Sequence, residues 1–96
     1  MASDEYRELL QTKRLEIVKS INCERSLLLN YLRAKLVFDQ EDCELIQGAN
    51  TNDARVGKLI DFLSKKGPEA YQCFIDVVQV ESPTLYESLT GEKANS

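Results

Sequence analysis

The segment FDQEDCEL, residues 38–45, gathers four carboxylates within six positions. Like charges held this close together repel one another, so the cluster by itself adds no stability to the fold. Paired carboxylates can act as general acid and base, but the polar sequence around them indicates a solvated surface rather than a pocket. The segment is therefore either a plain solvated surface or a surface that binds a positively charged partner.

The rest of the chain offers little for catalysis. There is no histidine, so the commonest general base and the Cys–His and Ser–His dyads are absent. The four glycines are scattered at positions 48, 57, 67 and 91 and form no phosphate-binding loop. Cys23, Cys43 and Cys73 form no CxxC pair, so we expect small buried hydrophobic residues rather than a zinc site or a disulfide. We expect no enzyme activity, cofactor or metal.

Length and net charge restrict the class of protein and its partners further. The 96 residues suit one domain, residues 1–96, and the net charge of −4 argues against nucleic acid as a partner. No apolar run approaches the ~20 residues that span a bilayer, and the N-terminus has no signal-peptide pattern. We therefore expect a cytoplasmic protein with no membrane partner.

Hydrophobic spacing predicts an all-α protein of six short helices. In residues 4–21, Tyr6, Leu10, Ile17 and Ile21 share one face, whereas Leu15 and Val18 lie off it. One straight helix could not bury both sets against a single partner, so we expect a bend near residues 12–15. The second helix follows a possible N-cap at Asn22, and its core stripe is Leu27, Leu28, Tyr31 and Leu32.

The acidic segment itself predicts a helix start. Asp39 at the N-cap and Asp42 three residues later form an acidic variant of the capping box. Phe38 and Cys43 occupy the two hydrophobic staple positions around it, while Leu45 and Ile46 are expected to pack inward before Gly48 ends the helix. Capping and the helix dipole account for the acids at 39, 41 and 42 but not for Glu44, which lies beyond the first turn.

Three more helices complete the predicted bundle. The fourth starts at Asn50 or Thr51, and Lys66-Gly67-Pro68 ends it and begins the fifth. Ser82-Pro83 starts the last helix, which stops at Gly91, and residues 92–96 are expected to be a frayed tail beyond a core of about 5–91. The stripes expected in the core are Val56, Leu59, Ile60 and Leu63, then Tyr71, Phe74, Ile75 and Val78, then Leu85 and Leu89.

Charge is distributed unevenly among these helices. Residues 39–44 hold four acids and no base, whereas residues 7–19 carry a net charge of +2 and residues 55–66 a net charge of +3. The simple explanation is i, i+4 pairing and solubility. The alternative is a pair of complementary faces on one molecule, which would join copies head to tail and need not close into a ring.

Two segments of the sequence resemble a known family. The segments YLRAKLVFDQEDCELIQ and ARVGKLIDFLSKKGPEAYQCFIDVV resemble a caspase recruitment domain (CARD), over about residues 5–91. The most specific part is RVGKLIDFL followed by Lys66-Gly67. The resemblance implies a death fold, a six-helix antiparallel Greek-key bundle whose first helix is often kinked, and it implies binding to other CARD-containing proteins.

The resemblance also implies which residues bind. In the commonest contact of the family, bases of the first and fourth helices meet acids of the second and third helices of the next copy. Transferred by position, the basic side comprises Arg14, Arg55 and Lys58, with Lys13 and Arg33 added, and the acidic side comprises Asp39, Glu41, Asp42 and Glu44.

Different segments of the chain resemble different subfamilies of CARDs. EDCEL and RVGKLIDFL are similar to an adaptor that links CARMA scaffolds to NF-κB activation, whereas SPTLYESLTGEK is similar to the CARD of a CARMA scaffold itself. We expect an adaptor module that assembles signalling filaments in NF-κB or innate immune signalling. The alternatives are an apoptotic or inflammasome CARD that recruits a caspase, a CARD-only decoy that caps filaments, and a structural bundle whose charges bind nothing specific.

Overall fold

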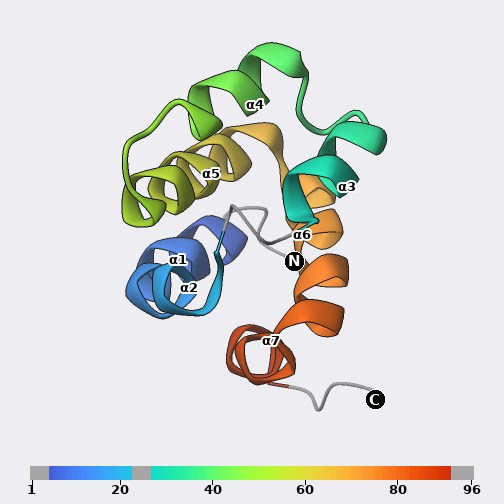
Figure 1. The fold of residues 1–96 in the computed structure, drawn as a ribbon. Coiled ribbons are helices and arrows are strands. Elements are labelled where there is room, and N and C mark those ends of the chain that lie inside the picture. Colours follow the sequence, from blue (N-terminus) through green and yellow to red (C-terminus); the bar gives the residue numbers. More distant parts are fainter. Residues whose placement is uncertain (1–4, 23–26, 92–96) are drawn as a thin grey trace.

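Seven helices make up the part of the chain that this computed structural model describes, residues 5–22 and 27–91 (Figure 1). No strand occurs among these residues, which confirms the all-α class. In chain order the helices are α1 (Glu5–Thr12), α2 (Arg14–Ser20), α3 (Leu28–Ala34), α4 (Gln40–Gln47), α5 (Asn52–Lys66), α6 (Pro68–Glu81) and α7 (Pro83–Thr90).

Seven helices appear instead of six because the first is broken at Lys13, within the predicted bend. Lys13 leaves the helical region at φ −98° and ψ 9°, although its N–H still donates to the Leu9 carbonyl over 2.9 Å. The break turns both halves of the segment toward the core, so that Leu10 and Ile17 are fully buried. Leu15, which the pattern placed off the stripe, is 66% exposed.

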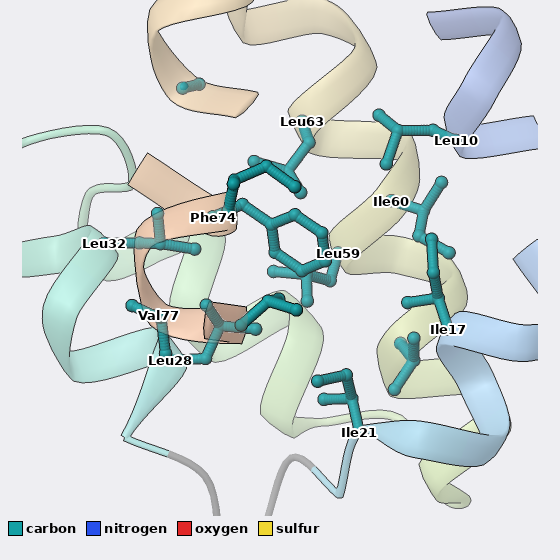
Figure 2. Packing of buried hydrophobic residues seen from close by; sticks show 14 of the residues in the cluster. Leu10, Ile17, Ile21, Leu28, Leu32, Leu59, Ile60, Leu63, Phe74 and Val77 are labelled. Carbon is teal, nitrogen blue, oxygen red and sulfur yellow. The ribbon is translucent and has the colours of Figure 1, made fainter. Parts of the chain in front are cut away.

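Helix α5 is the central element of the bundle. It packs against α1, α2, α4 and α6, and α4 lies on the opposite side of it from the α1–α2 pair (Figure 1). Its predicted stripe of Val56, Leu59, Ile60 and Leu63 is completely buried. Figure 2 shows Ile17 and Leu10 meeting Ile60 from one side while Phe74 of α6 meets Leu59 from another. Burial of this stripe fixes which side chains of α5 remain on the surface.

The predicted helix boundaries depend on particular caps. Thr51 caps α5 by accepting a hydrogen bond from the Ala54 N–H over 3.1 Å, and Pro68 and Pro83 occupy the first turns of α6 and α7. Gly67 has φ +105° and Gly91 has φ +75°, conformations that residues with a Cβ rarely adopt. These two glycines therefore separate α5 from α6 and end α7 where the pattern predicted.

Two predicted core residues are wrong. Leu27 is 66% exposed because it precedes α3, and the buried positions of that helix are Leu28, Leu29 and Leu32 instead. Leu45 is 48% exposed because α4 turns Cys43 and Ile46 inward, which leaves its neighbour facing out. The predicted tail at 92–96, the burial of the cysteine at position 23 and the helical segment directly after the possible cap at Asn22 lie outside the described residues.

Candidate protein-interaction surface

The acidic segment forms the capping box that its sequence predicts. An Asp39 carboxylate oxygen accepts from the Asp42 N–H over 2.8 Å, and an Asp42 oxygen accepts from the Asp39 N–H over 3.2 Å. Phe38 and Cys43, the two staple residues, are both buried. Asp39 and Asp42 therefore have a structural role in starting α4.

Asp42 is also paired with a base of its own molecule. Its Oδ2 lies 3.0 Å from the Lys66 Nζ in the last turn of α5. Partial burial acts to raise the pKa of Asp42, but the hydrogen bonds from Lys66 and from the Asp39 N–H outweigh it, and the pKa lies below the ordinary 3.8. Asp42 is thus an acid that the fold already neutralises in part.

Glu41 and Glu44 are left as the exposed acids of α4. They stand three residues apart, which places them on one face of the helix. Glu44 accepts a hydrogen bond from Gln40 Nε2 over 3.0 Å, and within the described residues neither glutamate forms an ion pair. We call Glu41 and Glu44 the acidic face, since capping occupies the other two predicted acids.

The basic side is assembled by Arg14 reaching from α2 across to α5. Its Nη1 lies 3.3 Å from Asp61 Oδ1, and its side chain remains 42% exposed. The guanidinium lies directly over Gly57: a Cβ added there would stand 2.7 Å from Arg14 Nη2. Gly57 is therefore the position at which α5 allows the arginine to approach closely.

Two further bases of α5 lie beside this arginine. Lys58 follows Gly57 directly and is exposed, and Arg55 precedes Lys58 by one helical turn. Arg55 is half-buried, and its Nε donates to the Ala49 carbonyl over 3.0 Å, which fixes it against the α4–α5 loop. We call Arg14, Arg55 and Lys58 the basic face. Lys13 lies at the break between α1 and α2, directly before Arg14 in the sequence, and is half-buried.

Arg33 lies elsewhere. It is exposed in the last turn of α3, a helix that packs on α4 and α6. Burial raises the pKa of the Cys43 thiol, and the nearby positive charge of Arg33 opposes that effect while Asp42 and Asp39 add to it. The structure thus brings Arg33 toward the acidic helix and not toward the basic face, in keeping with its place in the sequence close to the acidic segment.

The acidic and basic faces do not neutralise one another within one copy. Among the described residues, Arg14 is ion-paired with Asp61 and Asp42 with Lys66, and no ion pair joins Glu41 or Glu44 to Arg14 or Arg55. Helix α5 lies between α4 and the α1–α2 pair (Figure 1), and the acidic face is carried by α4 whereas the basic face is carried by α2 and α5.

Sequence reasoning missed Gly57 and Asp61 as parts of this surface. A glycine in the interior of a long helix costs stability, and that cost was the available signal that another group approaches the backbone there. Asp61 was counted only as an opposing charge. That it is four residues after Gly57, on the same helix face, becomes meaningful only once Arg14 is seen crossing there.

Two kinds of site are not found in the described part of the chain. No helix there has the length and apolar character needed to cross a membrane. No group of three or more histidine, cysteine, aspartate or glutamate residues there is arranged to hold a metal ion.

The described part of the chain is thus an all-helical bundle with its exposed acids on α4 and its exposed bases on α2 and α5. The profile of the family described as Caspase recruitment domain matches residues 7–92. The chain therefore belongs to the CARD family, a family of protein-interaction domains and not of enzymes.

A sequence match to a curated protein supports this family assignment. The chain is 36% identical over 87 residues to the mouse (Mus musculus) protein Caspase recruitment domain-containing protein 14, a match that covers 88% of this chain and 8% of that protein. The chain thus corresponds to a small part of the relative. No solved structure gives a significant match.

Proposed function

We propose that this chain is a CARD–CARD interaction module that joins copies head to tail into a signalling filament. The observation that supports the proposal is that, among the described residues, the acidic face on α4 and the basic face on α2 and α5 form no ion pair with one another within one copy, so that each can meet its complement on another CARD. A contact between two different faces repeats without limit when its rotation does not close, and the product is a helical filament.

The contact would be mainly electrostatic. Glu41 and Glu44 would meet Arg14, Arg55 and Lys58 of the next copy, so that charge steers the encounter and sets the register. Each contact between exposed charges is weak, and avidity along the assembly would supply the remaining stability. Other CARD-containing proteins, as scaffold, adaptor or caspase, are the proposed partners, and NF-κB or innate immune signalling in the cytoplasm is the proposed setting.

Charge reversal tests the proposal. Glu41→Lys and Lys58→Glu should each abolish filament growth, measured by light scattering and electron microscopy, while the circular dichroism spectrum and the melting temperature stay the same. Lys58 is preferred to Arg55 because it is exposed, whereas Arg55 is half-buried and also holds the Ala49 carbonyl. The matched controls are Glu87→Lys and Lys65→Glu, exposed residues outside both faces, which should polymerise normally.

Mixing the two variants makes the test sharper. Glu41→Lys retains its basic face and Lys58→Glu retains its acidic face, and the two introduced charges are opposite to one another, so the mixture should recover the filament growth that each variant alone has lost. Unchanged filament growth by either single variant would refute the proposed contact. A panel of purified CARDs, tested for binding to the unmutated chain, would then separate an NF-κB partner from a caspase partner.

A further inference from the structure

A second acidic surface exists that the proposed contact does not use. Helix α6 carries three acids, Glu69, Asp76 and Glu81, and no lysine or arginine. Asp76 is exposed on α6 and accepts a hydrogen bond from Gln72 Nε2 over 3.1 Å. This surface lies on an element that contributes neither to the acidic face nor to the basic face.

An apolar groove lies on this acidic surface. It runs between α3 and α6, has a volume of 210 Å³ and is lined by Leu27, Tyr31, Asp76, Val77, Val80 and Glu81. Leu27 and Val80 are 66% and 81% exposed, and the Leu27 N–H donates to Glu81 Oε2 over 2.9 Å. The groove therefore presents an apolar floor with carboxylates at its edge.

The same chain carries an apolar side chain flanked by bases. Leu36, between α3 and α4, is 90% exposed, the highest value among the exposed large hydrophobic residues of the described chain. It has φ +61°, a conformation that leucine rarely adopts, so the loop holds it outward at a cost in backbone energy. Arg33 and Lys35 precede it, both exposed. We call Leu36 with these two bases the knob.

We infer that the groove between α3 and α6 binds the Leu36 knob of a second copy of this chain. Charge complementarity supports this occupant, because a leucine beside the exposed Arg33 matches an apolar floor beside carboxylates, whereas Lys35 Nζ lies 5.6 Å from the centroid of the Tyr31 ring of its own copy. Three of the five exposed large hydrophobic residues in the described chain, Leu27, Leu36 and Val80, belong to the knob or to the groove. Burying them against one another would cover three of the five large apolar side chains that the described chain leaves exposed.

The experiment uses a background in which the charge contact is disabled. In Glu41→Lys protein, sedimentation velocity over a range of concentrations should show weak, reversible self-association. Adding Leu36→Gly, which suits the positive φ, or Val80→Lys, which repels the knob, should weaken that association at least tenfold. Leu15→Lys is the control for Val80→Lys, because it adds the same charge at an exposed leucine outside the knob and the groove. It should leave the self-association unchanged.

Complementation gives a second, independent result. The Leu36→Gly variant keeps its groove and the Val80→Lys variant keeps its knob, so the mixture should associate although each alone does not. Filaments in the Glu41→Lys background would refute the charge contact and not the groove. A Glu41→Lys protein that stays monomeric at every concentration, full association of either variant, or a mixture that remains monomeric would overturn the inference.

Discussion

At the scale of single residues, Gly57 leaves room on α5 for the side chain of Arg14. The arginine lies over the helix backbone at Gly57, on its way to Asp61, and any side chain there would displace the guanidinium. The displaced group is the end of a flexible side chain, so the fold can accommodate the change. The glycine thus allows the Arg14 guanidinium to lie close to the helix backbone, and it lowers the stability of the helix.

Gly57→Ala should consequently separate stability from binding. We expect the free energy of unfolding to be unchanged or to rise by about 0.5–1 kcal/mol, because alanine is the better helix former. Filament growth should weaken because Arg14 is moved. Urea melts and light scattering measure the two effects. Arg14→Ala should weaken growth similarly, and combining it with Gly57→Ala should add little, since both changes act on one group.

Tyr71 gives a second prediction at this scale. Its hydroxyl is buried and has no hydrogen-bond partner among the described residues, and burial raises its pKa to about 12. Tyr71→Phe should raise the free energy of unfolding by about 1 kcal/mol, the lower end of the cost of an unsatisfied buried group.

Tyr6 is the matched control because its ring lies 5.7 Å from that of Tyr71 and its hydroxyl is satisfied. The hydroxyl donates to the Ser64 carbonyl over 3.3 Å and accepts from Arg7 over 3.2 Å. Tyr6→Phe should lower the free energy of unfolding by about 0.5–1.5 kcal/mol. If both variants change stability in the same direction in urea melts, the proposed difference between the two hydroxyls is wrong.

At the scale of elements, the capping of α4 decides which acids of the segment remain on the surface. Asp39 and Asp42 fix the start of the helix, and that start determines that Cys43 and Ile46 face the core. Glu41 and Glu44 are then left on the surface. The helix position required by capping thus also determines which acids are available to a partner.

The capping box should make α4 sensitive to acid. The pKa of Asp42 is lower in the folded chain than its ordinary value of 3.8. Its contribution to stability is therefore present above the unfolded pKa and is lost as the pH falls through the folded pKa. Between pH 5 and pH 2, Asp42→Asn protein should lose stability less steeply than the unmutated chain in urea melts. Glu41→Gln should follow the unmutated curve, because Glu41 has no partner among the described residues.

At the scale of the whole molecule, the charge contact and the apolar contact respond differently to salt. The screening length falls from ~10 Å at 0.1 M to ~3 Å at 1 M, so the contact between exposed acidic and basic faces should weaken steeply. Contact through the groove should be weakened less, because the burial of its apolar floor is not screened and only its charged edge is. Filament growth should therefore be suppressed at 1 M sodium chloride while the association seen in Glu41→Lys protein survives, as measured by sedimentation.

Monomer stability should change little over the same range, because no charged residue is buried among the described residues. A melting temperature that drops together with filament growth at high salt would mean that the charges stabilise the fold instead of the assembly.

The sequence by itself determined the elements of this protein. The capping box at Asp39, the Thr51 cap, the prolines at 68 and 83 and the buried stripe of α5 all follow from local chemistry, because caps and periodicity act within a few residues of the chain. The bend at Lys13 was likewise visible in a hydrophobic stripe that one straight helix could not bury.

Only the tertiary structure decided which charges are free and which apolar residues are exposed. The pairing of Arg14 with Asp61 spans 47 positions and that of Asp42 with Lys66 joins two helices, and no local pattern encodes either pair. Leu27 and Leu45 matched helical periodicity but point outward, because periodicity gives the faces of a helix and not the neighbour that covers them. The packing of α4 and α2 on different sides of α5 is what keeps acid and base apart, since charge acts through space and not along the sequence.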